Sequence, residues 1–457
     1  MTESKPRTAG GKLSGWGRYP RARQTTLMRP ERMSEAVPPP TGHVLARGQG
    51  RSYGDAALAD AGLVLLTERL NRFRAFDETT GLLRAEAGVT LAELLTTFVP
   101  RGWFLPVTPG TKYASLGGCI AADVHGKNHH HDGTLGAHVA ELELVLADGS
   151  RRRCSPRVDA ELFWATVGGM GLTGIITELA LRLMPIETAY MIVRHQQARD
   201  LDKLLELLTD DVWDDKYSVA WVDCLARGRA LGRGVLIRGH HAAVTELPRK
   251  LGSPLQLKPP LQRNLPFDFP AWVLNSYTLA AFNQLYYHRQ AARTTPFVAT
   301  YDSFFYPLDR IGHWNRMYGA RGFIQYQCVL PPNTARRGLR LLLEALHGAG
   351  LASFLAVLKR FGASNPAPLS FPMAGYTLTL DLPVSGPRLF ALLERFDEIV
   401  LAHGGRVYLA KDACLKAESF GRMYPRLPEW QRVKRRVDPH DRFSSALSRR
   451  LRLGVDE

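Results

Sequence analysis

Two glycine-rich segments constrain the fold of this chain more than any other feature of its sequence. The first, Arg47-Gly48-Gln49-Gly50-Arg51-Ser52-Tyr53-Gly54-Asp55, directly follows a short apolar run at 43–46. Glycine permits positive φ angles and close approach of the backbone, so consecutive amides in such a loop can form a nest that binds an anion. With two arginines adding positive charge, the loop is suited to a diphosphate, although a charged surface turn would have the same composition.

The second segment runs from Pro109 to Gly118 and continues through small residues to Asn128. Small residues let a flat ligand lie against the backbone, and Ser115, His125 and Asn128 can hydrogen-bond to it. Three histidines follow at 129–131. Adjacent histidines point in different directions, and no cysteine or carboxylate joins them at ligand spacing, so we predict no metal site here.

A third glycine cluster, at 169–174, matches the dinucleotide fingerprint G-x-G-x-x-G literally. A Rossmann loop must open a helix so that the helix amides face the pyrophosphate. Here Ile175-Ile176-Thr177 follows, and β-branched residues favour a strand. We therefore reject a Rossmann fold.

Short apolar runs bounded by glycine and proline predict strands, whereas longer periodic segments predict helices. Strands are expected at 43–46, 62–66, 82–87, 139–147, 322–330 and 376–382, and helices at 91–99, 201–208 and 334–347. Thr90 is expected to cap the first helix, and Asp148-Gly149 is expected to form a hairpin turn after 139–147. Without a regular βαβ rhythm, this order predicts an α+β fold. The proline-rich stretch 251–270 predicts a long, mobile loop of the kind that often serves as a lid.

The chain carries 59 basic and 43 acidic residues, a formal net charge of +16. Such a field favours an anionic partner, either a phosphorylated substrate, an anionic lipid surface or nucleic acid. No nucleic-acid-binding motif accompanies the charge, so nucleic acid is the remote alternative. No uncharged stretch is long and apolar enough to span a membrane, and no secretory signal is seen, which predicts a cytoplasmic protein or one peripheral to the inner face of the membrane. The five scattered cysteines predict neither a disulfide framework nor a zinc site.

The loop 47–55, the segment 110–128 and Phe163-Trp164-Ala165-Thr166-Val167-Gly168-Gly169 with its following strand together resemble the FAD-binding domain of the vanillyl-alcohol-oxidase-type flavoproteins. The resemblance implies a two-subdomain FAD-binding domain at 6–188, a substrate domain at 189–405 and a tail at 406–454 that returns to the FAD domain. Because 47–55 contains no histidine, it implies that FAD is held noncovalently. The implied FAD contacts are Arg47, Gly48, Gln49, Gly50, Arg51, Ser52, Tyr53, Gly54, Asp55, Gly110, Thr111, Ser115, Leu116, Gly117, Gly118, His125, Gly126, Lys127, Asn128, Ile176, Tyr408 and Lys411.

Further segments are similar to the branch of this family that oxidises the 2′-hydroxyl of decaprenylphosphoryl-β-D-ribose, the first half of an epimerisation to the arabinose lipid used for cell-wall arabinan. These segments are 14–18, 124–130, 305–309, 314–316, 325–327, 367–372 and 410–412. This resemblance implies a polyprenylphosphoryl-ribose substrate, an NAD(P)H-dependent keto-reductase partner and an anionic membrane surface. Another FAD-dependent sugar or alditol oxidase is the main alternative, because a fold and a cofactor do not fix a substrate.

The same resemblance places Lys411, His125 and Tyr306 at the reaction. Lys411 would act as a base only if burial or neighbouring cations lower its pKa, and otherwise as a fixed cation; His125 is better suited to contact the flavin. Gln325 and Gln327 alternate along one strand and so share a face suited to sugar hydroxyls. The implied substrate contacts are Tyr306, Gln325, Gln327, Lys359 for the lipid phosphate, Thr377 and Thr379. Thr379 stands where the best-known members have a cysteine, so the pocket lacks a thiol at that point.

Overall fold

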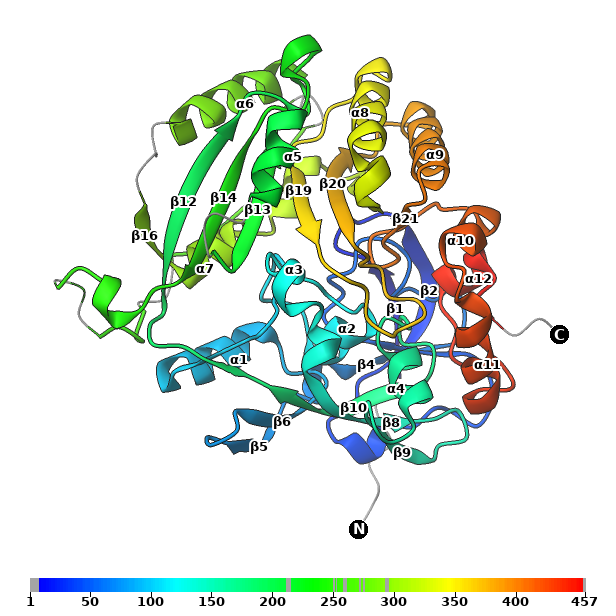
Figure 1. Ribbon diagram of the computed structural model, residues 1–457. Coiled ribbons are helices and arrows are strands. Elements are labelled where there is room, and N and C mark those ends of the chain that lie inside the picture. The colour runs from blue at the N-terminus through cyan, green and yellow to red at the C-terminus, as the bar shows by residue number, and fades with distance from the viewer. Residues whose placement is uncertain are drawn as a thin grey trace.

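The computed structural model describes residues 8–210, 215–249, 251, 253–257, 261–270, 273, 276–291 and 296–454. Its strands form three main sheets with helices packed against them (Figure 1). Antiparallel pairs predominate, and helices and strands do not alternate in βαβ units. The predicted α+β class is confirmed.

Two of the sheets belong to the N-terminal part of the chain, a four-stranded sheet of order β1-β2-β4-β3 and a five-stranded sheet of order β5-β6-β10-β8-β9. The strands are β1 (Thr8–Ser14), β2 (Arg21–Met28), β3 (Val44–Arg47), β4 (Leu63–Leu66), β5 (Phe73–Asp77), β6 (Leu82–Glu86), β8 (Val139–Val145), β9 (Arg151–Cys154) and β10 (Ile175–Arg182). The helices here are α1 (Leu91–Phe98), α2 (Leu116–Ala121), α3 (His129–Asp132) and α4 (Ala160–Thr166). Two short strands, β7 (Trp103–Phe104) and β11 (Met184–Pro185), form a separate antiparallel pair.

The third sheet has eight strands in the order β16-β12-β14-β13-β19-β20-β18-β21. Their bounds are β12 (Tyr190–Ala198), β13 (Tyr217–Val222), β14 (Gly234–His241), β16 (Phe297–Thr300), β18 (Phe323–Leu330), β19 (Ala356–Phe361), β20 (Gly375–Pro383) and β21 (Arg406–Val407). The helices packed around it are α5 (Leu201–Thr209), α6 (Ser276–Ala291), α7 (Tyr301–Phe305), α8 (Pro332–Gly348) and α9 (Pro387–Ala402).

The two faces of this sheet have different roles because side chains alternate along each strand. On β18, Tyr326 donates its hydroxyl to Asp397 Oδ1 on α9 at 2.9 Å, whereas its neighbours Gln325 and Gln327 line a cavity on the other face. On β13, Trp221 lines the same cavity and packs on Tyr286 of α6, with ring centroids 4.7 Å apart. One face is therefore covered by α5, α8 and α9, and α6 packs on the other (Figure 1). Three residues of α6, Phe282, Tyr286 and Gln290, line the cavity on that second face.

The C-terminal helices α10 (Ala417–Met423), α11 (Leu427–Val437) and α12 (Ala446–Leu451) return to the N-terminal part (Figure 1). Trp430 Nε1 donates to the carbonyl of Ala165 at 2.9 Å, and Phe443 forms a parallel bridge with Val44 of β3. Since β21 still pairs with β18, we place the start of this returning tail after Val407, slightly later than the boundary at 406 that the sequence suggested.

Most local predictions are confirmed. Thr90 and Glu93 form a capping box at the start of α1, and the turn at 148–149 joins β8 to β9 in a hairpin. Ile175 begins strand β10 directly after the glycine cluster, as the rejection of a Rossmann loop required.

Among the described residues of the proline-rich stretch 251–270, only β15 (Arg263–Asn264) is regular, and it pairs with β17 (Ile311–Gly312). The prediction of a long loop at 251–270 also covers residues 252 and 258–260, which lie outside the described residues. In the described part of the chain, no helix combines the length and apolar character needed to cross a bilayer.

Candidate active site

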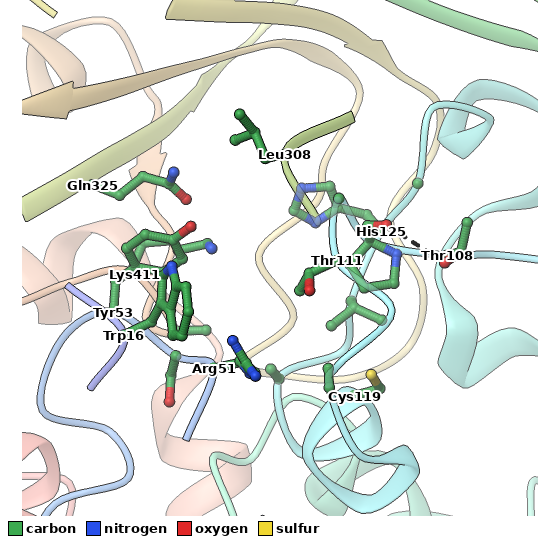
Figure 2. A pocket seen from close by; sticks show the side chains of 18 of the residues that line it. Trp16, Arg51, Tyr53, Thr108, Thr111, Cys119, His125, Leu308, Gln325 and Lys411 are labelled. Carbon is green, nitrogen blue, oxygen red and sulfur yellow. Dashed lines mark hydrogen bonds between the residues drawn. The ribbon is translucent and has the colours of Figure 1, made fainter. Parts of the chain in front are cut away.

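A cavity of about 780 Å³ lies where the glycine-rich segments of the N-terminal part face the third sheet (Figure 2). Its volume is in the upper part of the range of roughly 300–1,000 Å³ for ligand and cofactor sites. One wall is built from residues 46–53, 108–111, 114, 115, 117–119, 121, 122 and 124–127. The opposite wall is the cavity face of β18, β19 and β20, and the segment 408–411 joins the two walls.

The first wall has the form of a cradle for a flat, extended cofactor. Built on Gly117, a Cβ atom would lie 2.8 Å from the Cβ of Ala87, so glycine is required there. Built on Gly48, it would lie 2.1 Å from Ser115 Oγ, so the serine hydroxyl would have to rotate away. At Gly110 and Gly171 an added Cβ would meet no atom within 4 Å, because both face open space. Two polar atoms of this wall, Arg51 Nε and His125 Nδ1, are buried without a hydrogen-bond partner. These features fit FAD.

The two arginines of the 47–55 loop have separate roles. Arg47 donates to the carbonyls of Ala57 and Ser14, both at 2.7 Å, so its guanidinium supports the loop from within, and the prediction that it would hold a diphosphate is not favoured. The Arg51 guanidinium lies over Trp16, 4.2 Å from the ring centroid, and points into the cavity (Figure 2). Arg51 is therefore the cation of this loop that faces the ligand.

Four residues predicted to contact FAD lie outside the cavity lining, namely Gly54, Asp55, Leu116 and Asn128. Asp55 accepts two hydrogen bonds from Arg450, at 2.9 and 2.7 Å. The side-chain amide of Asn128 donates to Pro106 O at 2.7 Å. The Asp55 carboxylate and the side-chain nitrogen of Asn128 already have protein partners and hold the wall, whereas Asn128 Oδ1 is buried with no hydrogen-bond partner among the described residues. The other predicted FAD contacts line the cavity.

His125 is held in one orientation and in its neutral form. Gln327 Nε2 lies 2.9 Å from His125 Nε2 and donates to Thr377 Oγ1 at 3.1 Å. With Nε2 accepting this hydrogen bond, the imidazole proton is on Nδ1. Burial, reinforced by the charge of Lys359, lowers the pKa of His125 well below its usual range. His125 Nδ1–H can therefore donate a hydrogen bond to a ligand, but the imidazole is a weak base and a poor acceptor of a proton in the reaction.

Two predicted substrate contacts, Tyr306 and Thr377, are fully buried and lie behind the cavity wall. The hydroxyl groups of Tyr306 and Thr108 are 2.6 Å apart, and Thr108 lines the cavity. Thr377 accepts from Gln327, which also lines it. We assign both as positioning residues that act through Thr108 and Gln327, which corrects the prediction of a catalytic Tyr306.

Lys411 lies beside Tyr53 on one side of the cavity, with its Nζ 3.7 Å from the ring centroid of Tyr53 (Figure 2). Burial lowers the pKa of Lys411 to about 7, a change that Asp381 opposes and Lys359 reinforces. Asp381 is itself fully buried, and burial raises its pKa to about 6. A lysine with a pKa near 7 can exchange a proton at physiological pH, which an ordinary lysine cannot.

Asp381 also fixes the amide that lies beside Lys411. Gln325 Nε2 donates to Asp381 Oδ1 at 2.5 Å, and the hydroxyl of Tyr318 donates to Asp381 Oδ2 at 3.2 Å. Gln325 lines the cavity and also hydrogen-bonds to the side chain of Tyr53. Asp381 was not identified as a site residue from the sequence. A carboxylate inside the apolar strand 376–382 was a signal for it, because an aspartate is rarely buried without a specific partner.

The comparisons with known proteins agree with this geometry. Residues 41–155 match the model of the FAD-binding domain, and residues 382–451 match that of D-arabinono-1,4-lactone oxidase. Decaprenylphosphoryl-β-D-ribose oxidase of Mycolicibacterium smegmatis is 39% identical over 99% of this chain and 100% of its own length.

The chain belongs to the decaprenylphosphoryl-β-D-ribose oxidase family. It is an FAD-dependent oxidoreductase, and the remote alternative of a nucleic-acid-binding protein is set aside. An uncharacterized protein of Streptomyces coelicolor is 36% identical over 80% of the chain and its whole length. A putative D-arabinono-1,4-lactone oxidase of Neurospora crassa is 33% identical, but over only 37% of the chain and 30% of its own length.

Among the described residues that line the cavity, Cys119 alone carries a thiol, and its chemistry leads to a prediction about Thr379. Cys119 is fully buried and burial raises its pKa to about 12, so the thiolate that reacts with electrophiles is absent. Thr379 is slightly exposed on the cavity face. We expect maleimide to leave the native protein active and to inactivate the Thr379→Cys variant, with one added label in its mass spectrum. Rapid inactivation of the native protein would contradict the assigned burial of Cys119.

Proposed function

We propose that this chain oxidises the 2′-hydroxyl of a polyprenylphosphoryl ribose to a ketone. The observation that carries the proposal is the position of Lys411, a lysine of lowered pKa that shares one cavity with Gln325, Gln327 and two further lysines. Bound FAD supplies the acceptor for the hydride. The chain itself must bind the sugar, take the hydroxyl proton and hold the anionic lipid.

The proton is taken by Lys411 Nζ in its neutral form. Because the pKa is about 7, a substantial fraction of Lys411 is neutral at physiological pH. Gln325 and Gln327, held by Asp381 and Thr377, orient the hydroxyls of the ribose. His125 Nδ1 is a buried donor without a partner and is available to a ligand oxygen.

The phosphate lies between Lys127 and Lys359. Both line the cavity, and burial lowers the pKa of Lys127 to about 7 and that of Lys359 to about 8. The charge of Lys359 further lowers the pKa of Lys127, which means that the two cations disfavour one another. Lys127 donates to the carbonyl of Phe304. An anion bound between these lysines would stabilise both charges.

Much of the remaining cavity surface is apolar and suits a prenyl chain. Between the lysines and α6, the face of the third sheet carries Val193, Val219, Trp221, Ile237 and Val357. Burying such side chains against a hydrocarbon chain is favourable by about 25 cal/mol per Å². A free sugar or an alditol would leave this surface without a partner, so the lipid substrate is favoured over the alternative of a simple sugar or alditol oxidase.

The proposed function is tested by anaerobic mixing of the FAD-loaded protein with farnesylphosphoryl ribose, a soluble short-chain analogue. We expect the flavin absorbance to bleach in one turnover and the product to be lighter by two hydrogen atoms. Ribose 5-phosphate and arabinitol serve as matched controls without the prenyl chain. Bleaching by either control at the rate of the lipid, or no bleaching by the lipid, would contradict the proposal.

The form of FAD attachment is a separate prediction. Since 47–55 contains no histidine and the glycine wall approaches its ligand through the backbone, we expect noncovalent binding. Acid or heat should release FAD and leave a polypeptide of unmodified mass. A mass increase of one FAD that survives denaturation would contradict it.

Two partners complete the proposal. The ketone product needs a reductase to become an epimerised alcohol, and an NAD(P)H-dependent keto-reductase has the required chemistry. The lipid substrate resides in a membrane, and the net charge of +16 favours an anionic membrane surface.

A further inference from the structure

The exposed apolar side chains of this protein are unevenly distributed. Among the described residues, the exposed large hydrophobic side chains are three valines, Val37, Val158 and Val244, and four larger residues. The four larger residues all lie between 261 and 285, and they are Leu261 (78% exposed), Phe267 (62%), Phe282 (43%) and Leu285 (67%). Single exposed apolar residues are common, but large ones grouped in one segment mark an interaction surface.

This group borders the mouth of the active-site cavity. Phe282 lines the cavity while remaining partly exposed, and its ring stacks on Phe354, another lining residue, at 5.8 Å. Leu285 follows one turn later on α6, on the exposed side of the helix. The apolar surface of α6 is therefore continuous with the apolar interior of the cavity.

The loop carrying Leu261 and Phe267 packs on another part of the mouth. Gln262 Nε2 donates to Asp309 O at 3.0 Å, and Asp309 lines the cavity. The amide of Phe269 donates to Arg316 O at 2.9 Å, in the short helical segment that also contributes Trp314 to the lining. Leu261 and Phe267 thus stand on a loop fixed to the rim of the cavity.

The charge around these side chains is positive. Asp268 is the sole carboxylate in the sequence between Glu246 and Asp302, and it lies 2.6 Å from the guanidinium of Arg18. Among the described residues of the same stretch, Arg249, Arg263 and Arg289 are basic, and all three are exposed. Exposed apolar residues can enter the lipid, and the cations near them attract anionic head groups, while the one carboxylate is already paired. Such a surface is complementary to an anionic membrane.

We infer that α6 and the loop 261–270 form the face by which the protein docks on an anionic membrane, with Leu261, Phe267 and Leu285 entering the lipid and the cavity mouth opening toward it. The inference rests on the proposed function, because it gives a prenyl chain a path from the bilayer to the active site. A second copy of the chain or a protein partner on this face is treated below as an outcome of the test.

The test compares two double variants by co-sedimentation with phosphatidylcholine vesicles, with and without phosphatidylglycerol. Leu261→Glu/Leu285→Glu changes exposed residues that do not line the cavity. Val37→Glu/Val158→Glu is the matched control, since it adds the same charge at exposed positions outside the 261–291 region. We expect the native protein to prefer the anionic vesicles, the control to bind like it, and the first variant to bind at least about tenfold more weakly.

Kinetics separate this inference from the proposed function. The variant Leu261→Glu/Leu285→Glu should oxidise soluble farnesylphosphoryl ribose at the native rate and a long-chain substrate embedded in vesicles far more slowly. If neither the native protein nor the variants oxidise either substrate, the proposed function is wrong. The vesicle-binding measurement still tests the docking face in that case. Equal vesicle binding by both double variants would overturn the inference. The inference would also be overturned if the native protein were a dimer in solution and the variant Leu261→Glu/Leu285→Glu were a monomer, because a second copy would then occupy this face.

Discussion

Replacing Lys411 by methionine should slow the reduction of bound FAD by farnesylphosphoryl ribose by at least the factor of about 10² that is typical of a lost acid–base group. Methionine retains the unbranched shape of lysine but has no proton to exchange. The variant should stay folded and loaded with FAD, because the glycine wall that fits the cofactor is formed by residues from 46–53, 108–111 and 114–127. Anaerobic stopped-flow absorbance measures the rate directly.

The pH dependence of the native rate identifies what Lys411 does. Burial lowers its pKa to about 7, so the neutral amine becomes the major form as the pH rises through that value. If the amine takes the proton, the rate should rise through pH 7 and level off above it. A fixed cation would give the opposite slope, because the ammonium form is lost over the same range. At saturating substrate the Lys411→Met variant should lose this dependence, whereas the titration of Lys127 and Lys359, with pKa values of about 7 and 8, should still weaken substrate binding as the pH rises.

Lys416 provides a matched control for Lys411. It is exposed and pairs with Glu394 at 3.2 Å, outside the cavity. Lys416→Met should leave the rate of flavin reduction unchanged, since an exposed ion pair contributes little. A Lys411→Met protein that reduces its flavin at the native rate would remove Lys411 from the mechanism.

The elements of the fold that sequence reasoning found are those determined by local rules. The capping box at Thr90, the hairpin turn at 148–149 and the strand after Gly174 each depend on neighbours within a few residues. The eight-stranded sheet could not be predicted in the same way, because its order joins strands far apart in the sequence, such as β13 with β19. Strand order depends on the packing of whole elements, which no short pattern encodes.

The candidate site shows the same division. The residues of the cavity wall follow from glycine patterns and a family resemblance, and most of them line the cavity. The side chains that lie behind the wall and position its residues cannot be predicted from these patterns. Tyr306, Thr377 and Asp55 have the chemistry of ligand contacts, but each is taken up by a protein partner that comes from a distant segment or strand. A sequence gives the type of a polar group, and only the fold shows whether its hydrogen-bonding capacity is already used.

Arg450 is the clearest case of a residue that only the fold identifies. It lies on α12, close to the C-terminus, and joins two parts of the site. Its guanidinium donates to both oxygens of Asp55, to Asp412 Oδ2 at 2.8 Å and to Leu415 O at 2.6 Å. Asp55 ends the FAD loop, and Asp412 directly follows Lys411. One cation therefore ties the cofactor loop to the turn that carries the proposed base.

Replacing Arg450 by methionine should lower the free energy of unfolding by about 3 kcal/mol and weaken FAD retention. Removing one partner of a buried ion pair typically costs about 3–5 kcal/mol, and the lower end applies because Arg450 is 24% exposed. Two buried carboxylates would remain, and burial already raises the pKa of Asp55. Urea unfolding measures the stability, and the flavin absorbance retained after gel filtration measures FAD retention.

Two further variants decide whether the loss comes from the carboxylates left behind. Arg449, one position earlier, is 36% exposed and lies 3.5 Å from Asp60, so Arg449→Met should change the stability by less than about 0.5 kcal/mol. In the triple variant Asp55→Asn/Asp412→Asn/Arg450→Met no buried charge lacks its partner, and much of the lost stability should return. If the triple variant recovers stability but still loses FAD, Arg450 holds the 47–55 loop in its binding conformation. If Arg450→Met has the same stability and FAD retention as Arg449→Met, the contacts of Arg450 with Asp55 and Asp412 have no role in the site.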